Sequence, residues 1–391
     1  MDYDFPFSSL AVVDVPVENQ VTVAQLSNVF KVGTDHTFRL NGEYRINENN
    51  IFPQDLGTNS EVRYEVYTTS ALWSWDINDS VTFSNAVRYD KLRLNRKGPT
   101  ATPDDDASLN YTNSDFDKTI EELSINAGLV VKATDNDTFR ATYARGVDLP
   151  SIAEFGLQFP TLVGPPFGVS RWFLGNPDID VSIVNNYELN WQHEFYEYNS
   201  TLQVAAFYQT ASDMQSLDDF AKDVDLTSAP PSFNDTTPFR NHLDADVVGG
   251  EIEYSGTYDT NWRYSASYSL AVVTEDLLDT KAPAGVADED PINRYEGRNG
   301  EHKVNLNLGY EGDNYTIDGY AYYTSGFVQD RNDVDNDIDD NLILSLRGNY
   351  DITDKLSASV TAIGLQDDNW QESMAMEAER QIFFSVKYKL N

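Results

Sequence analysis

The sequence contains no cysteine among its 391 residues, and it has only four histidines. Disulfide bonds and thiol chemistry are therefore excluded. The histidines are scattered at His36, His193, His242 and His302, without the spacing of a metal site. Basic residues are also scarce, with 27 Lys and Arg against 64 Asp and Glu and a formal net charge of −37. With no basic patch in the sequence, this charge argues against nucleic-acid binding.

Long apolar segments are absent as well. No run of 18 apolar residues occurs, which excludes a transmembrane helix. The first residues, Met1 to Asp4, have neither the basic nor the apolar region of a secretory signal peptide. A membrane β-barrel is not excluded, because its strands carry apolar residues only at alternate positions. The high aromatic content of 13%, with 23 Tyr, suits strands and membrane interfaces.

Alternating apolar and polar residues predict strands along most of the chain. For example, Val304, Leu306 and Leu308 alternate with Lys303 and Asn305. We count about 15 such strands, or about 16 with a piece near the N-terminus. Turns of about two to five residues alternate with loops of about 13 to 36, as in outer-membrane barrels. The sequence therefore predicts an all-β, antiparallel transmembrane β-barrel. Its long loops are expected at 47–60, 95–116, 148–182, 213–243, 276–300, 326–340 and 367–378.

One pair of predicted strands is joined by an unusually long loop of about 35 residues. The first strand ends at Arg145-Gly146, where the alternation stops. Proline and turn-forming residues interrupt the loop before the next strand begins near Tyr187. The conspicuous residues of this stretch are Arg145, Gly146, Pro150, Ser151, Glu154, Gly175, Asn176, Pro177, Asn186, Tyr187, Glu188 and Leu189.

These residues resemble the signature region of TonB-dependent outer-membrane receptors. In that family an Arg-Gly strand end is followed by Pro-Ser-x-x-Glu, a Gly-Asn-Pro turn and an Asn-Tyr-Glu-Leu strand. Asp148-Leu149 and residues 179–182 depart from the pattern, and Leu390-Asn391 replaces the usual final Phe. The resemblance implies a Gram-negative outer-membrane location and a barrel of about 22 strands.

The resemblance also implies partners. A receptor of this kind contacts outer-membrane lipid, binds an extracellular small molecule, and meets TonB through an N-terminal plug. We expect residues 1–391 to form one receptor-like barrel domain that is the C-terminal part of a receptor, and we expect no plug domain in this sequence. The implied function is TonB-dependent uptake of a scarce nutrient, such as an iron–siderophore complex.

Two further groups of residues are candidates for binding. Arg171, Trp172 and Phe173 lie within the long loop, where aromatic and Arg side chains suit ligand contact. The alternative is that they pack the loop onto its neighbours. Asp333, Asp335, Asp337 and Asp339 place carboxylates at every second position, as calcium loops do. A solvated acidic loop is the simpler interpretation, because no Gly or downstream Glu completes a calcium motif.

No catalytic set emerges, because no nucleophile is paired with a base in a recognisable motif. We therefore expect no enzyme and no cofactor, with calcium at the acidic loop as the one candidate metal. A passive porin-like channel and a calcium-binding surface β-protein remain as alternative functions.

Overall fold

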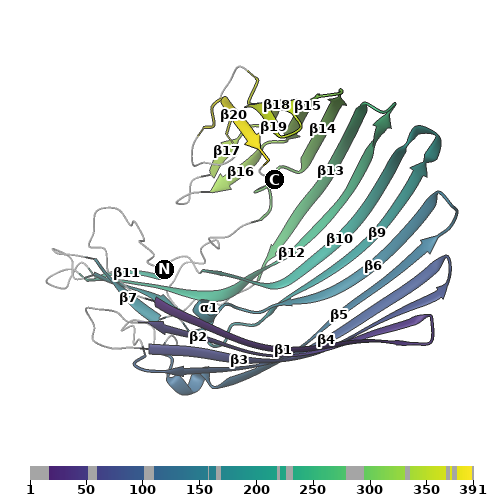
Figure 1. The fold of residues 1–391 in the computed structure, drawn as a ribbon. Coiled ribbons are helices and arrows are strands. Elements are labelled where there is room, and N and C mark those ends of the chain that lie inside the picture. The colour runs from purple at the N-terminus through teal and green to yellow at the C-terminus, as the bar shows by residue number, and fades with distance from the viewer. Residues whose placement is uncertain are drawn as a thin grey trace.

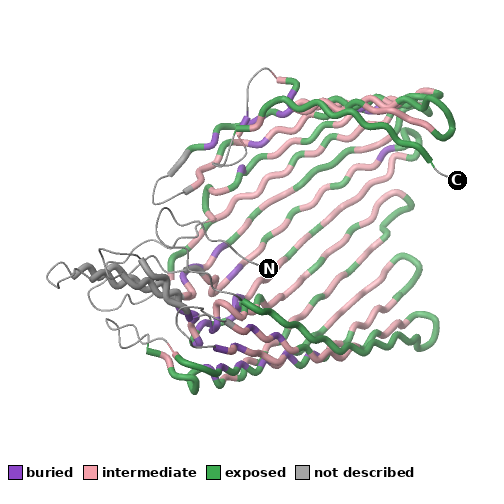
Figure 2. The backbone as a smooth tube through the Cα atoms, turned by 60° about the vertical axis from the view of Figure 1, so that its left-hand side comes forward, coloured by how far each residue is buried: buried purple, intermediate pink, exposed green. Residues whose placement is uncertain are grey.

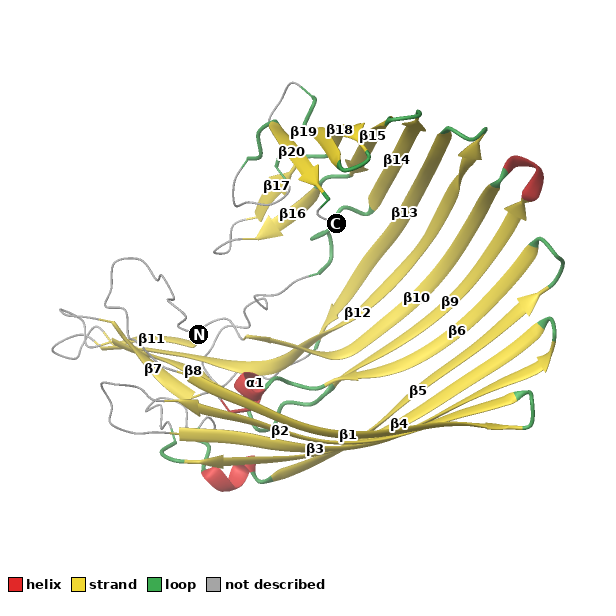
Figure 3. Cartoon of the chain, viewed as in Figure 1, coloured by secondary structure: helices red, strands yellow, loops and turns green. Residues whose placement is uncertain are grey.

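The computed structural model describes residues 17–51, 60–100, 110–156, 158–163, 169–217, 221–225, 232–278, 295–330, 335–366, 370–371 and 377–389. Within these ranges, no helix is long and apolar enough to cross a membrane. Among the described residues, helical turns are confined to α1 (Ile152–Gly156), η2 (Asn113–Phe116) and η3 (Tyr196–Tyr198). Almost everything else in the described ranges is β-strand (Figure 3).

One large antiparallel sheet of 15 strands dominates the structure, which confirms the predicted fold class and strand number. Apart from the small strands described below, each strand of this sheet is hydrogen-bonded to the strand that follows it in the chain. In spatial order they are β1 (Val17–Val32), β2 (His36–Ile51), β3 (Ser60–Asn78), β4 (Val81–Lys97), β5 (Lys118–Lys132), β6 (Asp137–Asp148), β9 (Ser182–Phe195), β10 (Ser200–Leu217), β12 (Ser232–Tyr258), β13 (Trp262–Leu277), β14 (His302–Glu311), β15 (Tyr315–Thr324), β18 (Asn341–Thr353), β19 (Leu356–Ile363) and β20 (Gln381–Tyr388).

The sheet curves into a trough (Figure 1). At one end the strands are joined by turns of two to four residues. Asn199 and Asp259 adopt positive φ angles of 45° and 56° in two of these turns, a conformation that Asn and Asp tolerate. The strand ends that lead into the longer connections lie at the opposite end (Figure 1). The predicted alternation of short and long connections is therefore present.

Several strands extend further toward the long loops than the sequence predicted. Residues 47–51 belong to β2, and residues 213–217 and 232–243 belong to β10 and β12. The expected loops 47–60 and 213–243 were therefore too long. Beyond the apolar part of the strands both faces carry polar residues, such as Asn47 and Glu48, so the alternation that marks a strand disappears.

Smaller strands lie among the long connections. β7 (Gln158–Val163) pairs with β8 (Val169–Leu174), which runs parallel to the start of β12. β11 (Ala221–Asp225) also pairs with the start of β12, and this pairing is antiparallel. A separate hairpin joins β16 (Phe327–Asp330) to β17 (Asp335–Ile338).

The sheet is open along two edges. Among the described residues, β1 pairs only with β2 and β20 pairs only with β19. The two edge strands lie on opposite sides of the trough (Figure 1). The described chain therefore forms a large part of a barrel wall, and its two edge strands do not pair with each other.

The two faces of the sheet differ in chemistry. Outward-pointing positions carry exposed apolar side chains, including Leu189, Leu306 and Phe384 with exposed fractions of 66%, 49% and 79%. The concave face carries polar side chains that bond to one another across strands. Arg140, for example, donates to Asn190 Oδ1 at 3.2 Å and to Gln192 Oε1 at 3.1 Å. The alternation predicted from the sequence thus produces one apolar and one polar face.

Aromatic side chains gather in two rows on the outward face. Near the short turns, ring pairs include Phe38–Trp73 at 6.4 Å and Trp262–Tyr310 at 4.8 Å. Nearer the long loops, Tyr187 lies 5.0 Å from Tyr143 and 6.3 Å from Tyr208 between ring centroids. Along β9 the rows are eight residues apart, from Tyr187 to Phe195, which is about 27 Å at about 3.4 Å per residue. This distance runs along the strand, and it is close to the length of about nine to eleven residues that a tilted barrel strand needs to cross the hydrocarbon core.

Buried residues are concentrated at the loop end of the concave face (Figure 2). Their largest apolar cluster contains Val62, Val66, Leu92, Leu94, Phe116, Phe155 and Ile179. Strands β3 and β4 contribute four of these seven residues, and the long connections contribute the other three. The loop end is therefore where the connections pack against the wall.

Candidate functional site

The long connection between β6 and β9 folds back onto the concave face. It begins with Ser151, whose backbone N–H donates to Glu154 Oε2 at 2.5 Å, while the backbone N–H of Glu154 donates to Ser151 Oγ at 3.2 Å. This reciprocal pair is a capping box, and it starts helix α1. Pro150 precedes the pair and is fully buried. The Pro-Ser-x-x-Glu motif is thus a helix-starting device.

Helix α1 carries Phe155 into the apolar cluster, where its side chain is completely buried. The next residue must be glycine because the helix lies directly against β3. A Cβ atom on Gly156 would lie 2.5 Å from Cγ1 of Val62, closer than real atoms approach. Burying a side chain as large as Phe155 is worth about 3–5 kcal/mol relative to alanine. This cluster is therefore a principal attachment of the connection to the wall.

Asn176 links three separate segments at the loop end. Its Oδ1 accepts hydrogen bonds from Tyr111 Oη at 3.1 Å and from the backbone N–H of Asp178 at 2.8 Å. Its Nδ2 donates to the carbonyl oxygen of Phe239 at 2.9 Å. The Gly-Asn-Pro motif therefore ties the β4–β5 connection, its own connection and β12 together. Lys118, the first residue of β5, adds an ion pair to Asp178.

Arg145 lies where β5 and β6 separate. The two strands stop pairing at Ile125 and Arg145, and β6 continues beside β9 alone. The guanidinium donates to the carbonyl oxygen of Leu123 and to Glu122 Oε2, the latter at 3.4 Å. Gly146 follows and pairs with Val184. Arg145 thus supplies a hydrogen bond to a backbone carbonyl of β5 beyond the point where β5 and β6 stop pairing.

Tyr187 and Glu188 begin the apolar part of β9 and point to opposite faces. Tyr187 stacks on the outward face, and Glu188 pairs in register with Thr142 and Phe207. The predicted motif residues of the β6–β9 connection do come together, around α1 and Asn176. Arg145, Tyr187 and Glu188 lie on the strands instead.

Sequence reasoning missed Arg96, which pins the β4–β5 connection to the wall. Its guanidinium lies 5.5 Å above the Phe116 ring, and it donates to Asn113 Oδ1 at 2.9 Å and to the carbonyl oxygen of Pro99 at 2.7 Å. Burial lowers the pKa of Arg96 to about 10, so it stays protonated at neutral pH. Nearby, hydrogen bonds from Thr112 hold the pKa of Asp115 below its usual value. In the sequence, an arginine on an alternating strand looks the same whether its side chain is solvated or buried against a connection.

An ion pair between an exposed arginine and a buried carboxylate lies on the concave wall beside the apolar cluster. Arg88 donates to both carboxylate oxygens of Asp90, at 2.6 and 2.9 Å. Asp90 is buried and also accepts from Thr68 Oγ1. Toward the opposite side of the trough, Arg263 bonds to Asp318 at 2.7 Å and to Glu311 at 3.3 Å. These contacts compensate the charges of Arg88 and Arg263.

The structure places Arg171, Trp172 and Phe173 on β8, in register with Asp235, Thr236 and Thr237 of β12. They are thus part of a small sheet above the loop end and do not lie in an irregular loop. Asp333 lies outside the described residues, Asp335 and Asp337 lie on β17, and exposed Asp339 follows that strand. No group of three or more His, Asp or Glu side chains in the described ranges is arranged to hold a metal ion. Calcium binding at this loop stays a prediction.

The family described as "TonB dependent receptor-like, beta-barrel" matches residues 3–365. The chain belongs to this family. The recognition made from the Arg-Gly, Pro-Ser-x-x-Glu and Gly-Asn-Pro motifs is therefore confirmed. No curated protein matches the sequence.

Solved structures of receptors share this fold. The copper transporter OprC superposes with a TM-score of 0.70 at 13% identity, covering 98% of this chain and 59% of its own. The pyoverdine outer membrane receptor FpvA of Pseudomonas aeruginosa gives 0.65 at 14% identity, with 97% and 54% covered. The ferric yersiniabactin uptake receptor FyuA of Yersinia pestis gives 0.60 at 15% identity, with 98% and 56% covered. This receptor-like chain spans between half and three fifths of the length of these proteins.

Proposed function

We propose that this chain forms a large part of the barrel wall of an outer-membrane receptor in a Gram-negative bacterium. The receptor takes up a scarce nutrient, such as an iron–siderophore complex. The observation that carries the proposal is the two-faced sheet. Its outward apolar band is bounded by aromatic rows, and its concave face is polar. In outer-membrane barrels, lipid covers such an apolar band. The backbone there needs no water, because paired strands satisfy its hydrogen bonds.

The ligand side of this receptor is the end that bears the long connections. The β6–β9 connection packs over the concave wall there, and β8 carries Arg171 and Trp172 beside β12. We propose that these residues contact an extracellular small molecule. Energised uptake requires TonB, which acts through a plug folded inside the barrel. The transport receptors of this family are not enzymes, and we propose no catalytic role for this chain.

Uptake by intact cells tests this proposal. Cells expressing a longer, plug-complete receptor that contains residues 1–391 are given labelled ferric siderophores and copper complexes, with and without TonB. We expect accumulation of one class of complex, and only where TonB is present. Arg171→Ala should weaken surface binding about tenfold, the effect of losing one strong interface contact. Leu306→Ala on the outward face is the matched control and should leave binding unchanged.

Accumulation that does not depend on TonB would contradict the proposal and would favour a passive channel. Binding that is unchanged in Arg171→Ala would remove β8 from the ligand site while leaving the receptor function in place.

A further inference from the structure

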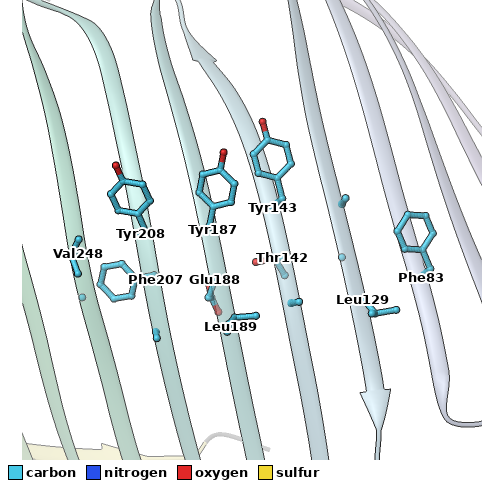
Figure 4. Close-up of a pocket in the computed structure, with 15 residues that line it drawn as sticks. Phe83, Leu129, Thr142, Tyr143, Tyr187, Glu188, Leu189, Phe207, Tyr208 and Val248 are labelled. Atoms are coloured by element: carbon cyan, nitrogen blue, oxygen red, sulfur yellow. The ribbon is translucent and has the colours of Figure 1, made fainter.

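A hollow of about 640 Å³ interrupts the outward face of the sheet across β5, β6, β9 and β10 (Figure 4). Toward the long loops it is bounded by the rings of Tyr143, Tyr187 and Tyr208. Toward the short turns it is bounded by Leu129 and Leu189. Its volume falls in the range of about 300–1,000 Å³ found for small-molecule sites.

Small side chains create this hollow. Ala141 and Ala206 flank Leu189 in register, and Ala127 lies beside Tyr143. All three alanines line the hollow. Large residues surround them, and Leu189 and Tyr187 are 66% and 48% exposed. The hollow therefore results from small side chains among large ones on an otherwise continuous apolar surface.

The hollow has a polar end. The three tyrosine hydroxyls point in one direction, toward the long loops (Figure 4). Tyr143 Oη donates to Asn185 Oδ1 at 3.1 Å, and Tyr208 Oη donates to Asp246 Oδ2 at 3.1 Å. Asp246 is exposed, whereas the nearby cation Arg145 is already paired with Glu122. The polar end therefore offers hydrogen-bond acceptors and negative charge.

We propose that this hollow binds one bilayer lipid, with an acyl chain in the hollow and a hydrogen-bond-donating head group at Asp246. The apolar hollow continues into the outward band, and the tyrosine row marks the level at which a lipid changes from chain to head group. Bulk lipid already surrounds the band, so selectivity comes from close packing in the hollow and from hydrogen bonds at Asp246. This inference rests on the proposed membrane location.

Phosphatidylethanolamine and phosphatidylcholine with identical acyl chains form a matched pair of probes. They carry the same net charge, but only the first has N–H donors. Native mass spectrometry of a longer chain, which contains residues 1–391 and supplies further strands to the open edges, counts the lipids that remain bound in mixed micelles. We expect one retained phosphatidylethanolamine, favoured about tenfold over phosphatidylcholine, the effect of one hydrogen bond to a charged group.

Filling the hollow should abolish this retention. Ala206→Phe on β10 and Ala141→Phe on β6 each place a ring in the space that the chain occupies. Ala321→Phe is the control, because Ala321 shares the outward face with Leu306 and Leu344 but does not line the hollow. Heat-modifiable migration confirms that each variant is folded. The unmodified chain supplies the head-group comparison even where a variant fails to fold.

Equal lipid retention in Ala206→Phe, Ala141→Phe and Ala321→Phe would overturn the lipid site. Equal retention of the two lipids by the unmodified chain would overturn the role of Asp246. Failure of the chain to enter bilayers at all is a different outcome, which would refute the membrane location proposed above.

Discussion

Leu306→Arg is expected to destabilise the membrane-embedded sheet by about 2–4 kcal/mol, the cost of an arginine that faces lipid near the bilayer centre. Leu306 lies midway along β14 on the outward face. Its neighbour Asn305 faces the trough, where its Nδ2 donates to Ser267 Oγ at 3.3 Å. Asn305→Arg should cost less than about 1 kcal/mol, since the new charge meets water. Urea unfolding in liposomes measures both variants, each made in a longer chain that supplies further strands to the open edges.

Equal losses at the two positions would refute the assignment of the faces. Leu306→Ala serves as a second control, because it shortens the side chain without introducing charge into lipid.

Residues 1–391 refolded alone are expected to give neither a monodisperse barrel nor a steady single-channel conductance. β1 and β20 each leave one edge without a described partner. Every residue of both strands is exposed, which is expected of strands with a neighbour on one side only. Unpaired backbone groups are very costly in lipid, and exposed edges promote aggregation. Heat-modifiable migration and planar-bilayer recording test this expectation.

A monodisperse species with stable conductance would show that β1 and β20 pair with each other in the membrane. That result would support the passive-channel alternative. Addition of a longer chain that supplies further strands is the control, and it should restore a heat-modifiable species.

The strands within the apolar band could be predicted from the sequence because one of their faces is apolar and the other is polar. Leu306 and Asn305 show how directly this alternation reports the two faces. The short turns were predictable as well, since Asn199 and Asp259 take positive φ angles that few other residues tolerate.

The loop end could not be predicted in the same way. Both faces carry polar residues there, so the ends of β2 and β12 show no alternation. The parallel pairing of β8 with β12 joins segments that are far apart in the sequence. The motif residues were recognised by resemblance, but their roles follow only from three-dimensional contacts. Glu154 caps a helix, and Asn176 joins three segments.

The most direct test of the two-faced wall is a cysteine scan along β9. The chain has no native cysteine, so each single substitution from Asn186 to His193 reports one position. A membrane-impermeant maleimide is applied, in liposomes, to a longer cysteine-free chain that contains residues 1–391 and supplies further strands to the open edges. Strong labelling is predicted at 188, 190 and 192, which face the trough, and weak labelling at 187, 189 and 191, which face lipid. Uniform labelling, or labelling of the opposite set, would contradict the proposed arrangement.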